Sequence, residues 1–210
     1  MQETLDYVLK NAISNDPKAV IQCIDDYVKQ SGKFLMNVGP EKGNILKKEI
    51  LRSKPARVLE LGSFIGYSAI LMASSIDNES KLISIDIDSK SIEISKKMVS
   101  FAGLDNKIQF IEGSASRVIP ILEEGFDFVF IDHGKKSYLN DLLLLEEHSL
   151  LNQNAVVFAD NVGIFENELE NYLNHVRKSK LYQSSNIASK LEYRDNIYDA
   201  VEISIHRQED

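Results

Sequence analysis

Residues 59–68 read LELGSFIGYS, a short apolar run followed by two glycines and the start of a helical pattern. Gly62 permits a tight turn after the apolar run, and Gly66 permits a ligand to approach the backbone closely at the helix start. Three residues separate the glycines, unlike in the G-x-G-x-x-G motif of dinucleotide-binding proteins. Glu60 would repel a pyrophosphate, but it suits the ammonium group of an amino-acid ligand. A plain strand-to-helix turn is the alternative interpretation.

Around this motif, short apolar runs alternate with helical patterns from residue 54 onward. Runs such as 126–132 are apolar on both faces, as expected of a parallel strand that helices cover on both sides. We therefore predict an α/β fold with an open, wound, mostly parallel sheet. The predicted strands are residues 56–61, 82–86, 108–112, 126–132 and 155–160, and the predicted helices are residues 67–75, 89–102, 116–123, 138–151 and 167–178.

Two further strand-like segments, residues 180–187 and 198–206, close the chain. The connection between them, residues 191–197, is too short for a helical crossover between parallel strands. We therefore predict that they form an antiparallel pair at one edge of the sheet.

The first 53 residues have helical patterns instead of strand-like ones. Asp16 and Pro17 are suited to begin a helix that ends at Gly32, and Pro40 is suited to begin another that runs to residue 51. The chain has no repeats and no long flexible linker. We predict a single domain, residues 1–210, with a helical cap (1–53) and a sheet core (54–210).

Composition restricts the class of protein and its partners. The formal net charge is -8, which would repel a polyanion, so we expect no nucleic-acid partner. Cys23 is the only cysteine; no intrachain disulfide can form, which favours a reducing compartment. The N-terminal sequence MQETLDYVLKNAI has the features of neither a signal peptide nor a membrane span. We expect a cytoplasmic protein without a membrane partner, present as a monomer or a weak homodimer.

Polar residues follow the second and third predicted strands. Asp86 ends the second strand, where a carboxylate can accept hydrogen bonds from both hydroxyls of a ribose. The alternative is that Asp86 or Asp88 caps the next helix. The segment Gly113-Ser114-Ala115-Ser116 could border an adenine ring, although ordinary turns have the same composition.

The fourth and fifth strands end in Asp132-His133-Gly134-Lys135 and Asp160-Asn161. Because adjacent parallel strands bring these ends close together, two carboxylates and an amide oxygen form a hard set of ligands suited to Mg²⁺. His133 could also bind a metal, but we favour packing or a cofactor contact for it. Lys135 could accept a proton beside a cation, although an exposed surface lysine is the alternative. Glu192 could lie over the same end of the sheet. The default interpretation is that Glu192 forms an ion pair with Arg194 on the surface.

These motifs together resemble the catechol O-methyltransferase family, over nearly the whole chain from about residue 4 to residue 206. The segments that carry the resemblance are residues 36–39, 59–62 with 66–68, 98–103, 132–135, 143–147, 159–162 and 191–194. The resemblance implies a Rossmann-like class I methyltransferase. Its sheet would have seven strands, mostly parallel with an antiparallel last strand, and helices on both faces.

The resemblance also assigns roles by position. It implies that Lys135 deprotonates the hydroxyl to be methylated, that Glu192 binds the neighbouring hydroxyl, and that Asn161 touches the substrate. The implied Mg²⁺ ligands are Asp132, Asp160 and Asn161. The residues implied to surround S-adenosylmethionine are Val38, Glu60, Gly62, Ser68, Asp86, Ser116 and Asp132.

Several positions depart from the family pattern. Gly134 stands where well-known members have a tryptophan, which removes an aromatic wall beside the adenine. Phe34 replaces another tryptophan, Phe165 a proline and Ala115 a serine. An aromatic clamp for a flat ring is retained in altered form.

We predict Mg²⁺-dependent transfer of a methyl group from S-adenosylmethionine to one hydroxyl of a catechol-type small molecule. One alternative is another vicinal diol or a hydroxylated phenylpropanoid as the acceptor. Another is a scaffold that binds S-adenosylmethionine without catalysis, which would have no need of the five polar residues Asp132, Lys135, Asp160, Asn161 and Glu192.

Overall fold

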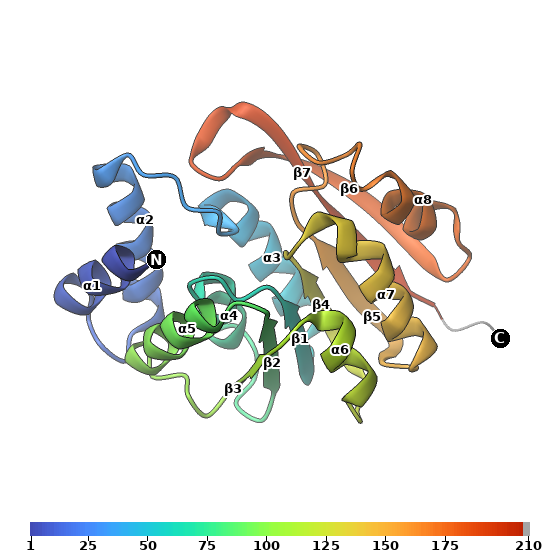
Figure 1. Ribbon diagram of the computed structural model, residues 1–210, viewed down its shortest axis with the longest axis horizontal. Helices are drawn as coiled ribbons and strands as arrows, with labels where there is room; N and C mark the ends of the chain where they lie inside the picture. The colour runs from blue at the N-terminus through green and yellow to red at the C-terminus, as the bar shows by residue number, and fades with distance from the viewer. Residues whose placement is uncertain (208–210) are drawn as a thin grey trace.

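The computed structural model describes residues 1–207, which form a central sheet with helices on both faces (Figure 1). The strands are β1 (Arg57–Leu61), β2 (Lys81–Asp86), β3 (Ile108–Glu112), β4 (Phe126–Ile131), β5 (Leu151–Ala159), β6 (Tyr182–Leu191) and β7 (Arg194–His206). The helices are α1 (Gln2–Asn11), α2 (Pro17–Ser31), α3 (Gly39–Ser53), α4 (Tyr67–Ala73), α5 (Ser89–Phe101), α6 (Ala115–Val118), α7 (Tyr138–Glu147) and α8 (Glu170–Lys178).

The seven-stranded sheet has the order β3-β2-β1-β4-β5-β7-β6. Strands β1 to β5 pair in parallel, and β7 is antiparallel to both of its neighbours. The predicted Rossmann-like fold is confirmed. Because the strand order reverses between β1 and β4, the carboxyl ends of these strands form the crevice in which such sheets bind ligands.

Several element boundaries differ from the prediction for local reasons. The helix predicted over residues 116–123 is only α6 followed by a 3-10 turn, η1 (Ile119–Ile121), because Pro120 has no N–H to continue an α-helix. The helix predicted over residues 138–151 ends at Glu147, and β5 begins at Leu151, earlier than expected. The connection predicted over residues 191–197 lies mostly within β7, so β6 and β7 form one long hairpin.

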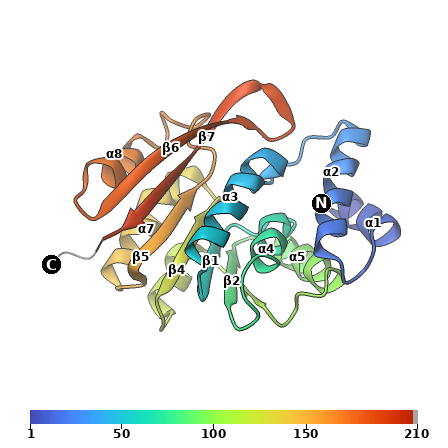
Figure 2. The same cartoon turned by 180° about the vertical axis from the view of Figure 1, so that it is seen from behind.

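Helices α1, α2 and α3 lie within residues 1–53, and α1 and α2 lie beside α4 and α5 (Figure 1). The Asp16 carboxylate accepts a hydrogen bond of 3.0 Å from the amide of Ala19 and so caps α2, as predicted. Gly32, with φ of 65°, ends α2. The hairpin β6–β7 extends beside α3 (Figure 2). Within residues 1–207, no helix combines the length and the apolar character needed to cross a membrane.

Apolar side chains form one core on each face of the sheet. On one face, residues of α1 to α5, such as Leu46 and Met98, pack on strand residues such as Phe128. On the other face, residues of α6 to α8, such as Tyr172, pack on strand residues such as Leu59. The strands are therefore covered on both sides, which fixes where their carboxyl ends lie.

Candidate active site

A cavity of about 310 Å³ lies at the carboxyl ends of β1, β2 and β4. Four segments line most of it: residues 61–68 after β1, 85–87 after β2, 113–116 after β3 and 132–134 after β4. Of the residues predicted to surround a cofactor, the lining contains Gly62, Ser68, Asp86, Ser116 and Asp132. Val38 and Glu60 are buried and do not belong to the lining.

The turn after β1 is shaped by Asp86 and by the absence of a side chain at Gly62. One carboxylate oxygen of Asp86 accepts hydrogen bonds from the amides of Ser63 (2.8 Å) and Phe64 (3.1 Å). Gly62 has φ of 105°, and a Cβ there would lie 2.5 Å from the carbonyl oxygen of Asp132. Asp88, rather than Asp86, caps α5, so Asp86 is left at the edge of the cavity.

Glu60 lies behind the wall of this cavity. Its carboxylate accepts hydrogen bonds from the hydroxyls of Ser68 and Ser84, and its exposed fraction is 0%. Burial raises the pKa of Glu60 to about 8, although the two serine hydroxyls oppose the shift. Ser68 also lines the cavity, so its hydrogen bond joins the cavity wall to the buried carboxyl of Glu60.

The ends of β4 and β5 converge on the ammonium of Lys135. Its Nζ lies 2.9 Å from Asp132 Oδ1 and 3.0 Å from Asn161 Oδ1. It also donates a hydrogen bond of 2.7 Å to the hydroxyl of Tyr138, which in turn donates to the carbonyl oxygen of Asp160. The alternative of an exposed surface lysine is wrong, because the side chain is only 9% exposed.

Asp160 is fully buried and uses its two oxygens differently. Oδ1 accepts one hydrogen bond of 2.7 Å from the amide of Asn161, and it lies 2.8 Å from Lys42 Nζ. Oδ2 has no hydrogen-bond partner among residues 1–207. Burial raises the pKa of Asp160, and the ammonium of Lys42 opposes this effect. An unpaired carboxylate oxygen in such a place is costly unless a cation or a proton satisfies it.

Glu192 joins the same group from the tip of the hairpin. The default of a surface pair with Arg194 is wrong: Glu192 is 5% exposed and contacts Lys42. Its Oε1 also accepts a hydrogen bond of 2.8 Å from Asn161 Nδ2. Arg194 instead lies over the ring of Phe34, 5.7 Å from the ring centre. The structure thus brings all five predicted metal and acceptor residues to one place: Asp132, Lys135, Asp160, Asn161 and Glu192.

Two charged residues of this region were not predicted from the sequence, and two others were. Lys42 and Asp199 complete the polar cluster, with their charged groups 2.7 Å apart. His133 pairs with Asp141 at 2.7 Å and stacks on Tyr138, which agrees with a packing role for this histidine. Within residues 1–207, a Cβ at Gly134 would meet nothing within 4 Å, so this position faces open space.

The hairpin and the N-terminal cap are joined beside the cavity. The hydroxyl of Tyr193 donates a hydrogen bond of 2.8 Å to Asp25 of α2 and accepts one of 3.1 Å from Asn37. Ser189 of β6 donates one of 2.9 Å to Glu41 of α3. Asn37 also lines the cavity, so these bonds fix part of its wall.

Comparison with known proteins decides the class to which this site belongs. A family model described as "O-methyltransferase" matches residues 11–197. The chain belongs to the O-methyltransferase family. It is 35% identical to catechol O-methyltransferase of Bos taurus over 211 residues, which covers 98% of this chain and 76% of the relative. Catechol O-methyltransferase B of Danio rerio is 36% identical over 91% of this chain and 74% of the relative. The predicted resemblance and the predicted enzyme class are confirmed.

Solved structures of O-methyltransferases share this fold. The O-methyltransferase TomG of Streptomyces achromogenes, in complex with SAM, has a TM-score of 0.79 at 18% identity, covering 90% of each chain. The O-methyltransferase of Bacillus cereus, in complex with SAH, has a TM-score of 0.78 at 16% identity, covering 90% of this chain and 91% of the other.

Proposed function

We propose that this O-methyltransferase transfers a methyl group from S-adenosylmethionine to one hydroxyl of a catechol-type acceptor, in a reaction that requires Mg²⁺. The observation that carries the proposal is that Lys135 Nζ contacts both Asp132 and Asn161 beside the cavity, next to the buried Asp160, whose Oδ2 has no partner among residues 1–207. Similarity to curated catechol O-methyltransferases over nearly the full chain supports the choice of acceptor.

The oxygen set, Asp132, Asp160 and Asn161, fits a Mg²⁺ ion. Two carboxylates and an amide are hard oxygen ligands, and too few to complete six-fold coordination, which leaves room for acceptor oxygens and water. The surrounding cluster holds four carboxylates and two ammonium groups, Lys42 and Lys135. The carboxylates outnumber the ammonium groups by two, and a divalent cation would balance this excess of negative charge. Bound there, Mg²⁺ would favour loss of a proton from a coordinated hydroxyl.

The cavity fits S-adenosylmethionine by its polar groups. Asp86 at the end of β2 is placed to accept hydrogen bonds from ribose hydroxyls. Ser116 and the neighbouring backbone border the part of the cavity that would hold the adenine. Ser68, together with the buried carboxyl of Glu60 behind it, is placed for the amino-acid part. When bound, this cofactor supplies a methyl group on a positively charged sulfur.

Lys135 and Glu192 are placed to handle the two hydroxyls of the acceptor. In this proposal the neutral amine of Lys135, formed when its ammonium gives up a proton to solvent, would accept the proton of the hydroxyl to be methylated. Asp132 and Asn161, which Lys135 contacts here, would then be free to hold the metal. Glu192 accepts a hydrogen bond from the neighbouring hydroxyl. Phe165, whose ring centre is 5.6 Å from Lys135 Nζ, would border the acceptor ring. Orientation of this kind can supply about 7–11 kcal/mol of the acceleration.

The test is a methyl-transfer assay with S-adenosylmethionine, with Mg²⁺ or with EDTA. The acceptors are catechol, phenol and resorcinol, because only the first has adjacent hydroxyls. We expect turnover of catechol alone and loss of that turnover in EDTA. Equal rates on phenol would contradict the requirement for two adjacent hydroxyls. Full activity in EDTA would contradict the role of Mg²⁺.

A further inference from the structure

Lys42 is a buried cation that the proposed mechanism does not yet use. It belongs to the first turn of α3, and its side chain is 0% exposed. Its ammonium contacts the buried triad of Asp160, Glu192 and Asp199. Although burial disfavours a charged lysine, the three carboxylates together raise its pKa above the usual value. Lys42 is thus a buried cation paired with three carboxylates.

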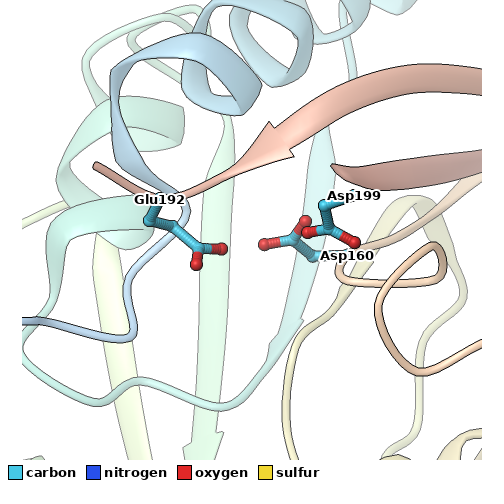
Figure 3. Close-up of side chains that lie close together, drawn as sticks. All are labelled: Asp160, Glu192 and Asp199. Atoms are coloured by element: carbon cyan, nitrogen blue, oxygen red, sulfur yellow. The ribbon is translucent and has the colours of Figure 1, made fainter. Parts of the chain in front are cut away.

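The buried triad has the spacing of a metal site. One oxygen of each of its three carboxylates lies within 4.8 Å of the others, and Figure 3 shows the three side chains close together. The ammonium of Lys42 lies 2.8 Å from Asp160 and 2.7 Å from Asp199, and so it occupies the space that a divalent ion would need. The same carboxylates would otherwise compete with the oxygen set for Mg²⁺.

Lys42 also determines which carboxylate oxygens remain free. It engages Oδ1 of Asp160, while Oδ2 is left without a partner among residues 1–207. Lys42 also contacts Oε1 of Glu192, which accepts a second hydrogen bond from Asn161 Nδ2. The other oxygen of Glu192, Oε2, accepts no hydrogen bond from the part of the chain that the structure describes. Asp160 and Glu192 therefore each keep one oxygen for a ligand, whereas both oxygens of Asp199 accept hydrogen bonds.

We propose that Lys42 is a positioning residue of the acceptor site. Its ammonium fills the buried triad, so that a divalent ion is confined to the oxygen set and Glu192 stays free to bind the acceptor. This inference rests on the proposed function for the acceptor and the metal, but the occupation of the triad by an ammonium can be tested without turnover.

The experiment compares the wild type with Lys42→Met, which keeps the length of the side chain but removes its charge. Lys47→Met is the matched control, because Lys47 is an exposed lysine of the same helix. Each protein is saturated with S-adenosylhomocysteine, and the number of bound Mn²⁺ ions is measured by electron paramagnetic resonance. Calorimetry then measures the affinities for S-adenosylhomocysteine and, with Mg²⁺ present, for catechol.

We expect the wild type and Lys47→Met to bind one Mn²⁺ and Lys42→Met to bind a second ion in the vacated triad. Catechol affinity should fall about tenfold or more in Lys42→Met, as for other residues that orient metal ligands, while affinity for S-adenosylhomocysteine stays within about twofold. A merely structural role would not add a metal ion. Unchanged Mn²⁺ binding and unchanged catechol affinity in Lys42→Met would overturn the proposal.

The results also separate this inference from the proposed function. If the wild type binds no Mn²⁺ while Lys42→Met binds one, the proposed Mg²⁺ requirement fails, but the occupation of the triad by the ammonium of Lys42 stands. If Lys42→Met does not fold in EDTA, the double variant Lys42→Met/Asp199→Asn is measured in its place, because it keeps three oxygen donors and the wild-type net charge. Failure of both variants to fold with Mn²⁺ would contradict replacement of the ammonium by a divalent ion.

Discussion

Replacing Glu60 by glutamine is expected to make the protein without cofactor more stable at alkaline pH. The carboxyl group of Glu60 is fully buried and has a pKa of about 8, against an ordinary value of 4.5. Between these two pH values the unfolded chain releases the proton and the folded chain keeps it. The folded state therefore loses stability as pH rises through this window. Glutamine cannot ionise, so Glu60→Gln escapes this loss.

The size of the effect follows from the two pKa values. Each pH unit within the window corresponds to about 1.4 kcal/mol, so the difference between 4.5 and about 8 corresponds to about 5 kcal/mol at most. Relative to the wild type, the free energy of unfolding of Glu60→Gln should therefore rise steadily from pH 5 to pH 8. Above pH 8 both states of the wild type are ionised, and the difference should level off.

The assay is urea unfolding at intervals between pH 5 and pH 9, without cofactor or divalent ions. Glu112→Gln is the control, because Glu112 is an exposed glutamate at the end of β3, which β2 separates from β1 in the sheet. The groups that titrate elsewhere are the same in all three proteins, so they cancel in the differences. Parallel stability curves for the wild type and Glu60→Gln would refute the reasoning and show that Glu60 is ionised in the folded protein at neutral pH.

Three other substitutions test the remaining parts of the site. Lys135→Met should lower kcat by about 10²–10⁴-fold with little change in the affinity for S-adenosylhomocysteine; an unchanged kcat in a methyl-transfer assay would remove Lys135 as the base. Asp160→Asn should abolish the stimulation of turnover by Mg²⁺, measured by titrating Mg²⁺ into EDTA-treated protein, and retained stimulation would argue against this ligand. Gly62→Ala should destabilise the protein by about 1–3 kcal/mol or more, since its Cβ would collide with the Asp132 carbonyl and its φ is positive; thermal unfolding measures this, and a wild-type midpoint would contradict the steric argument.

The fold could be predicted because its signals are local. The apolar run before Gly62, and similar runs ending at Asp86 and Asp132, each indicate a strand followed by a turn, and parallel pairing then places all three ends at one edge. The boundaries that were missed depend on single residues, such as Pro120, or on hairpin pairing. That pairing extends β6 and β7 through polar segments that have no alternating pattern of their own.

The candidate site was predictable only where its residues follow strands. Lys42 lies in a stretch of α3 that reads as an ordinary amphipathic helix start, and its partner Asp199 is 157 positions away in the chain. No local pattern marks either residue, because the burial that makes them important arises only when the hairpin folds against α3. The same holds for Glu192, whose sequence neighbours suggest a surface turn.

The hydrogen bonds of Tyr193 with Asp25 and Asn37 bear on which parts of this enzyme could be removed and where another protein could be fused to it. A fragment that starts after residue 53 would keep every strand and most of the proposed ligands. It would lack Lys42, and the hairpin tip that carries Glu192 and Tyr193 would lose its contacts with α2 and α3. Helices α1 to α3 therefore cannot be removed without changing the site, and a fusion partner should be attached elsewhere on the molecule.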